Sequence, residues 1–165
     1  MDILKVSTDW AKAEVFSARI VLLLGLLMVL VALGFWQLGK SAMAKDFVWP
    51  MLVAGVLLFA VSAGLYFANQ PRIARFEAAY AAGAKSFVQA EIERTGKSQN
   101  DFVVVFRVLP LIVIAGALLI MFTSAPLWRS IGVTVIALMT ILMLVDSNTN
   151  ARNTVYHQHL LAERG

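Results

Sequence analysis

Four long runs of uncharged, mostly apolar residues dominate the pattern along the chain. They hold 20, 25, 21 and 16 residues, and only Arg129 separates the third from the fourth. A helix needs about 20 apolar residues to cross the hydrocarbon core of a bilayer. The fourth run is short, but it spans when Arg129 snorkels at one interface and Asp146 lies at the other. The predicted transmembrane helices are residues 20–38, 47–69, 104–123 and 127–145.

Segments with one apolar face connect and flank these predicted crossings. Residues 72–94 are typical of a helix, because Pro71 suits its first turn and Gly96 lies just beyond its end. Their apolar side chains recur at alternating spacings of three and four, which places them on one face. The N-terminal arm, residues 1–19, and the tail, residues 146–165, show weaker versions of this pattern. The stripe on residues 72–94 consists of Ile73, Phe76, Tyr80, Gly83, Phe87 and Ala90, and its large side chains, Ile73, Phe76, Tyr80 and Phe87, are the candidates for binding a partner.

This stripe has two interpretations. It can pack on the other amphipathic segments of the protein, so that the three segments form a small collar beside the membrane. Alternatively, it can dock on a helix of a partner protein or lie on an anionic membrane surface. The overall expectation is an all-α integral membrane protein with four transmembrane helices and amphipathic cytoplasmic helices, forming a single membrane domain.

Composition agrees with a membrane protein and excludes several other classes. Hydrophobic residues make up 60% of the 165 residues and charged residues 15%, against about 45–50% and about 25% in soluble domains. So many apolar side chains exclude both a soluble fold of this size and a disordered chain. The chain has no cysteine, which rules out disulfides and thiolate metal sites. The net charge of +4 is modest and requires no nucleic-acid partner.

The basic residues predict the orientation in the membrane. Eleven Lys and Arg residues fall in the N-terminal arm, the segment between the second and third crossings and the tail, while the two short loops hold three. Loops rich in Lys and Arg stay in the cytoplasm. Both termini and the long middle segment are therefore expected to be cytoplasmic. A small chain without cysteine or an organelle signal favours a bacterial inner membrane.

The predicted crossings contain little that could carry chemistry. No ionisable side chain lies near the middle of any of them, which disfavours a proton-coupled transporter. The chain has no H-E-x-x-H, G-x-S-x-G or P-loop motif. Glu91 and Glu93 are two residues apart on a helix and do not converge for acid–base work. We therefore expect no enzymatic activity, no metal and no cofactor.

The most polar segment of the chain follows the fourth crossing. If the helix continues, four of its polar side chains share one face, at spacings of four, three and four residues. Such a face could bind a lipid headgroup, a metal or a charged side chain of a partner, or it could be a solvated turn that caps the membrane helix. A metal is disfavoured because only one carboxylate is present. The face consists of Asp146, Asn150, Asn153 and His157.

Small residues indicate where membrane helices could approach closely. Ala60 and Gly64 form a small-xxx-small pair, which favours packing within the bundle, with formation of a homo-oligomer as the alternative. The two halves of the chain also show weak sequence similarity, because the segment before the first crossing resembles the segment at the start of the third. This similarity suggests a parallel repeat of two helical hairpins.

These features favour a non-enzymatic protein that binds or assembles with another protein. Two settings fit: an immunity protein against a membrane-acting toxin, or an accessory subunit of a larger membrane complex. In size, topology and lack of catalytic residues the chain is similar in outline to colicin-type immunity proteins. The alternative is a small homo-oligomeric channel or transporter, because a pore built from several copies needs no charged residue. The partners expected are therefore the lipid bilayer and a protein bound through cytoplasmic or transmembrane helices.

Overall fold

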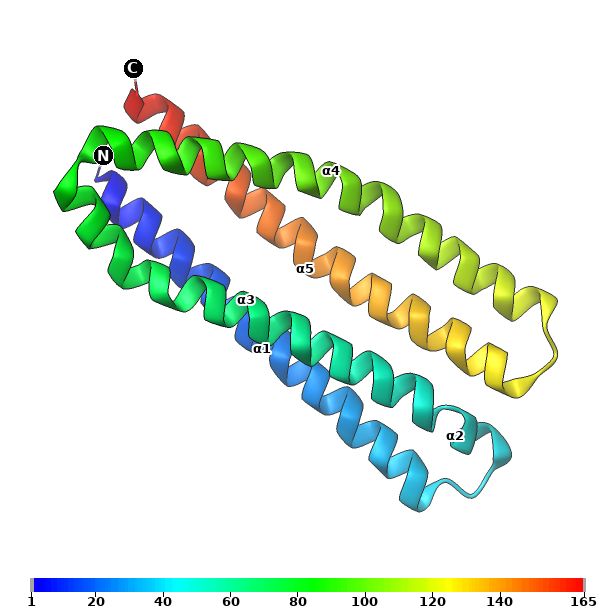
Figure 1. Cartoon of the computed structure of the whole chain (residues 1–165). Coiled ribbons are helices and arrows are strands. Elements are labelled where there is room, and N and C mark those ends of the chain that lie inside the picture. The colour runs from blue at the N-terminus through cyan, green and yellow to red at the C-terminus, as the bar shows by residue number, and fades with distance from the viewer. Residues whose placement is uncertain (1, 165) are drawn as a thin grey trace.

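The computed structural model describes residues 2–164, which form five helices. Four of these helices are long and apolar enough to cross a membrane, and no strand occurs among the described residues. This confirms the all-α fold with four candidate membrane spans. The helices are α1 (Ile3–Leu38), α2 (Ala42–Asp46), α3 (Val48–Ala82), α4 (Ala84–Phe122) and α5 (Pro126–Arg164) (Figure 1).

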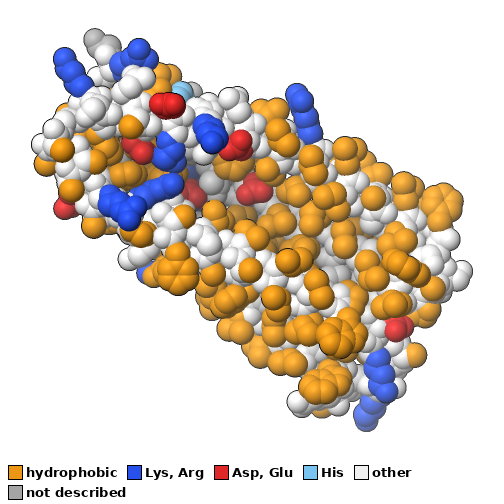
Figure 2. All heavy atoms as spheres, in the orientation of Figure 1, with side chains coloured by type: hydrophobic (Ala, Val, Ile, Leu, Met, Phe, Trp, Pro, Cys, Tyr) orange, Lys and Arg blue, Asp and Glu red, His pale blue; other side chains and the backbone are white. Residues whose placement is uncertain are grey.

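Each long helix extends well beyond its apolar run. With 36 residues and a rise of 1.5 Å per residue, α1 is about 54 Å long, whereas the hydrocarbon core of a bilayer measures about 30 Å. The excess gathers at the end of the bundle that carries both termini, where most of the charged side chains lie (Figure 2). We call this part, residues 3–19, 70–103 and 146–164, the polar end.

The polar end contains two helices where the sequence predicted one over residues 72–94. α3 continues through Pro71 as far as Ala82, and α4 begins at Ala84 after a reversal of the chain at Gly83. The reversal is tight: the Ser86 hydroxyl donates to the carbonyl oxygen of Gly83 at 2.8 Å, and an added Cβ on Gly83 would lie 2.8 Å from that hydroxyl oxygen. Both helices contribute apolar side chains to the same core. This explains why the heptad-like spacing continues across the turn.

The long helices pair as two hairpins, α1 with α3 and α4 with α5, which lie side by side in Figure 1. In each hairpin the two backbones approach closely at a pair of glycines. A Cβ added to Gly25 would lie 2.8 Å from the amide nitrogen of Phe59 and 3.1 Å from the carbonyl oxygen of Gly55. A Cβ added to Gly132 would lie 2.8 Å from the carbonyl oxygen of Gly116. This shared construction agrees with a parallel repeat of hairpins.

The two hairpins meet mainly through α5. A buried apolar cluster in the membrane half joins α1, α3 and α5, and the Ser130 hydroxyl of α5 donates to the carbonyl oxygen of Asp46 at 2.8 Å. In contrast, α4 packs chiefly on α5, and Gly116 is the only buried residue in its apolar half. The cluster consists of Val21, Met28, Ala54, Leu58 and Leu138.

Three of the four tryptophans lie where a membrane interface would be. Trp36, Trp49 and Trp128 are exposed at the end opposite the polar end, as expected for indole rings at the headgroup level. Trp10, in contrast, is buried in the polar end. Since α1 continues as a helix beyond the membrane, Trp10 faces the other helices instead of the lipid.

The small-xxx-small pair does not pack within the chain. Ala60 and Gly64 are exposed, and a Cβ added to Gly64 would meet no atom within 4 Å. The close approach on α3 occurs at Gly55, about two and a half turns earlier. The small-xxx-small spacing therefore did not identify the packing contact of α3, which is made at Gly55, opposite Gly25 of α1.

Candidate functional site: a buried polar network

All four long helices contribute to one core at the polar end. Within the stripe predicted on residues 72–94, Phe76 and Phe87 are buried with ring centroids 5.4 Å apart, and Ile73 and Tyr80 pack against the core as half-buried side chains. The structure thus places the stripe inside the protein, as in the first of its two interpretations. The buried members of this core are Ile3, Trp10, Ala11, Phe76, Phe87, Val88, Tyr156 and Leu160.

A buried carboxylate lies within this core. Arg94 holds Glu91 by three hydrogen bonds of 2.7–3.1 Å, and the hydroxyl of Tyr156 donates to Oε2 of Glu91 at 3.0 Å. The same hydroxyl lies 2.8 Å from Oγ of Ser7. Burial, together with the negative charge of Glu91, raises the pKa of Tyr156 far above its usual value. Tyr156 therefore remains a neutral donor that connects α1, α4 and α5.

Trp10 lies between two of these groups. Its ring stacks on Tyr156 with centroids 5.2 Å apart, and the guanidinium of Arg94 lies 4.4 Å from its ring centroid. A cation over an indole face is attracted by the ring quadrupole, more strongly where water is excluded. Arg94 thus links α4 to α1 as well as neutralising Glu91.

A second ion pair connects the two hairpins. Glu14 of α1 is buried and lies 2.9 Å from a guanidinium nitrogen of Arg152 on α5, with a further hydrogen bond of 3.0 Å from Nε of Arg152. Thr149 adds a long hydrogen bond of 3.4 Å to the same carboxylate. Because the two partners are 138 residues apart, this pair fixes the relative position of the first and last helices.

The polar face predicted after the fourth crossing contacts α4. The side-chain amide of Asn153 donates to the carbonyl oxygen of Thr95 at 3.0 Å, and Nδ1 of His157 lies 2.6 Å from the Thr95 hydroxyl. Asp146 and Asn150 are half-buried on the same helix. The face therefore serves as a helix–helix contact over its Asn153–His157 half, an arrangement that the sequence interpretations did not include.

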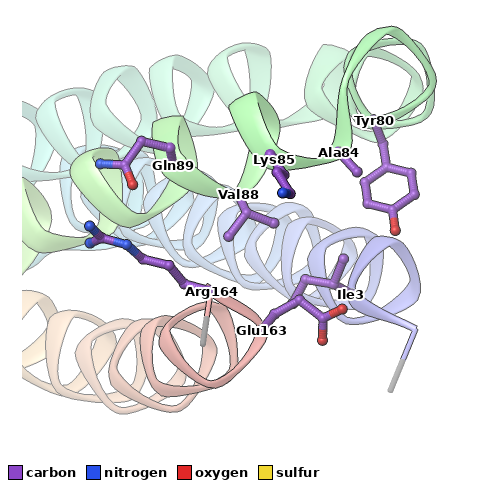
Figure 3. Close-up of a pocket in the computed structure, with 8 residues that line it drawn as sticks. All are labelled: Ile3, Tyr80, Ala84, Lys85, Val88, Gln89, Glu163 and Arg164. Atoms are coloured by element: carbon purple, nitrogen blue, oxygen red, sulfur yellow. The ribbon is translucent and has the colours of Figure 1, made fainter.

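A pocket of about 400 Å³ lies at the tip of the polar end, between the ends of all four long helices (Figure 3). Ile3 of α1, Tyr80 of α3, Lys85 of α4 and Glu163 of α5 are among the residues that line it. The lining mixes apolar and charged side chains and lies beyond the Glu91 network. Within residues 2–164, no group of three or more metal-ligating side chains gathers anywhere.

Sequence reasoning missed most of this network. Ser7, Trp10 and Glu14 continue the heptad spacing that begins at Ile3, and Glu91 and Arg94 continue the spacing from Phe87. Polar residues at core positions of an amphipathic helix were therefore the available signal. Glu91 and Arg94 pair within α4, but the other partners lie on different helices, so those pairings required the fold.

Neither a protein-family model, nor a curated protein, nor a solved structure matches this chain. The function is therefore inferred from the sequence and from the geometry of the molecule. That geometry pairs both buried carboxylates with arginines, an arrangement that fixes helices in place and leaves neither carboxylate as a free base.

Proposed function

We propose that the chain is a non-enzymatic binding protein of the membrane, which holds a transmembrane segment of another protein against α4. The observation that supports this proposal is the environment of α4 in its apolar half. There the helix packs chiefly on α5, only Gly116 is buried, and the side chains of its opposite surface are exposed. A partner helix on that surface would complete a layer that α1, α3 and α5 leave open.

The exposed surface of α4 has the spacing used by paired helices. Its side chains follow one another at intervals of four and three residues, which matches left-handed helix pairs. Ala115 lies at the centre of the stripe and would let a second backbone approach closely. We call this stripe the outer face of α4; it consists of Val104, Val108, Leu111, Ala115, Leu118 and Phe122.

Two biological settings fit such a protein. As an immunity protein, it would intercept a toxin that inserts into the membrane, and the outer face of α4 would bind the inserted helix. As an accessory subunit, it would hold a helix of a larger membrane complex. In both settings we place the chain in a bacterial inner membrane with the polar end in the cytoplasm, because 11 of its 14 basic residues flank that side.

Site-specific photocrosslinking in living cells tests the proposal. A photoreactive residue replaces Leu111 on the outer face of α4, or Leu27 on the lipid-exposed surface of α1 as a matched control. Both side chains are more than half exposed and lie seven residues inside the predicted spans. We expect a discrete crosslink to a different protein from position 111 and none from position 27.

The identity of the crosslinked protein separates the two settings. A toxin is expected to stop growth when it is produced without this chain, whereas a complex subunit is expected to lose its assembly. Replacing Leu111 by Trp should weaken either complex more than replacing Leu27 by Trp. Crosslinks only between identical copies, together with ion flux through reconstituted vesicles, would contradict the proposal and favour a homo-oligomeric channel.

A further inference from the structure

Among the described arginines of the polar end that have no carboxylate partner, Arg72 is the one that is not exposed. Arg72 of α3 is half-buried, and its Nη1 donates to Oδ1 of Asn69 at 2.8 Å. Asn69 is itself fixed, because its amide donates to the carbonyl oxygen of Leu65 at 2.9 Å. Among the described residues, no carboxylate oxygen lies within 4.0 Å of Arg72, whereas Arg94 and Arg152 each have one.

The charges around Arg72 leave an excess of positive charge. Arg94 and Glu91 of α4 and Glu14 of α1 all act on its guanidinium, and burial together with Arg94 lowers its pKa. With Arg152 included, the cluster contains three arginines and two carboxylates, a net charge of +1 in a partly buried place. A buried charge is costly unless it is paired, so this cluster favours an added anion.

The depth of Arg72 relative to the membrane points to the source of that anion. Phe67 of α3 is 71% exposed and marks the apolar surface, and Arg72 lies five residues, about 7.5 Å, beyond it. The polar layer of a bilayer adds about 5–8 Å on each side of the hydrocarbon core. The guanidinium is therefore at the level of the lipid phosphates. The guanidinium of Arg19 on α1 lies over the ring of Tyr66 on α3.

The surface is hollowed where this charged region meets the apolar belt. Figure 2 shows a recess between the charged end and the apolar surface, with acidic and basic side chains around it. Arg72 lies on α3 and the Glu91–Arg94 pair on α4, so each hairpin contributes one of them. A phosphate at this position could reach the guanidinium from the bilayer while its acyl chains remain in the hydrocarbon core.

We propose that Arg72 binds the phosphate of an anionic phospholipid at the junction of the two hairpins. A guanidinium presents two parallel N–H groups to a phosphate, a geometry that a lysine cannot reproduce. The other sources of an anion are free phosphate and an acidic side chain of a partner protein. The lipid is favoured because of the depth of the site and because lipid is present at that level at all times.

Native mass spectrometry of the full chain in a neutral detergent tests this proposal. The protein is titrated with phosphatidylglycerol, phosphatidylcholine or inorganic phosphate, and the bound fraction is measured. The informative variant is Arg72→Gln, which removes the charge and keeps a donor for Asn69. Arg75→Gln is the matched control, because Arg75 is exposed on the same helix one turn further on. Far-UV circular dichroism verifies that each variant is folded.

We expect the wild-type chain to bind phosphatidylglycerol at least about ten-fold more tightly than phosphatidylcholine, since a charge-assisted hydrogen bond contributes about that factor. Arg72→Gln should abolish this preference and Arg75→Gln should retain it. If Arg72→Gln does not fold, Arg72→Lys, which keeps the charge and loses the paired geometry, should weaken the preference several-fold.

Equal losses in Arg72→Gln and Arg75→Gln would overturn the site and indicate general attraction to a basic surface. Displacement of the lipid by millimolar inorganic phosphate would show that the ligand is free phosphate. A wild-type chain that shows no lipid preference, while Arg72→Gln weakens the crosslinked protein complex, would assign the arginine to a partner carboxylate. The lipid titration uses the isolated chain, so its result is independent of the proposed function.

Discussion

The two glycines of α1 should respond in opposite directions to the same substitution. In Gly25→Ala, the new methyl group would lie 2.8 Å from the amide nitrogen of Phe59, whereas ordinary van der Waals contact begins at 3.4 Å. The difference, 3.4 minus 2.8, is 0.6 Å, and the obstructing atoms belong to the backbone of α3. In Gly34→Ala, the methyl group would meet nothing within 4 Å.

The magnitudes follow from two competing terms. Replacing glycine by alanine inside a helix stabilises it by about 1 kcal/mol, and Gly34→Ala should show this gain alone. Overpacking at a closed contact costs about 1–3 kcal/mol, so Gly25→Ala should lose up to about 2 kcal/mol in total. Association of helices in lipid depends on close packing and not on burial from water, which makes the contact at Gly25 the deciding term.

The measurement is reversible unfolding in mixed micelles, with far-UV circular dichroism recorded against the fraction of denaturing detergent. We expect the midpoint of Gly34→Ala to equal or exceed that of the wild-type chain and the midpoint of Gly25→Ala to fall below it. If Gly25→Ala proves as stable as Gly34→Ala, then α1 and α3 do not approach at this glycine, and the hairpin geometry argued above is wrong.

Three further predictions concern the polar end and the orientation. Burial and a neighbouring carboxylate raise the pKa of Tyr156 above its ordinary value of 10.0, so the folded chain keeps a proton that the unfolded chain loses. The free energy of unfolding should therefore fall as the pH rises above 10, and Tyr156→Phe should flatten this dependence. In a double-mutant cycle, Glu14→Gln and Arg152→Gln should show a coupling of about 1 kcal/mol or more, and additive effects would contradict a direct pair. Since the chain lacks cysteine, a membrane-impermeant maleimide should label Met43→Cys in intact cells and Gln158→Cys only after the membrane is opened; the reverse pattern would contradict the predicted orientation.

The four membrane helices could be predicted because lipid restricts the backbone so strongly. An apolar run of about 20 residues in a bilayer has to satisfy its own backbone hydrogen bonds, and a helix does so. The path of the chain between the second and third crossings could not be predicted in the same way. A heptad-like stripe shows which side chains share a core. The same spacing results from one continuous helix and from two helices joined by a chain reversal at Gly83.

The candidate site was harder to predict than the fold, because its partners are distant along the chain. Glu14 and Arg152 are 138 residues apart, and no local pattern connects them. The glycines show the same limit. Gly55 and Gly64 both lie in the second apolar run, yet only Gly55 faces another backbone. Composition shows that small residues are present, but contact depends on how the facing helix is rotated.

The contacts within each hairpin differ from the contacts between the hairpins. This difference connects the proposed partner site on α4 with the proposed anion site at Arg72. Within each hairpin, facing glycines bring the backbones close along the membrane half. Between the hairpins, α5 carries the apolar contacts, and the Glu14–Arg152 pair and the Tyr156 network add polar ones at the polar end. An anion bound at Arg72 would strengthen this junction, because it would compensate the excess positive charge there. Loss of Glu14 should then loosen the junction at the polar end while the apolar cluster remains, and it should alter how α4 is presented to a partner helix.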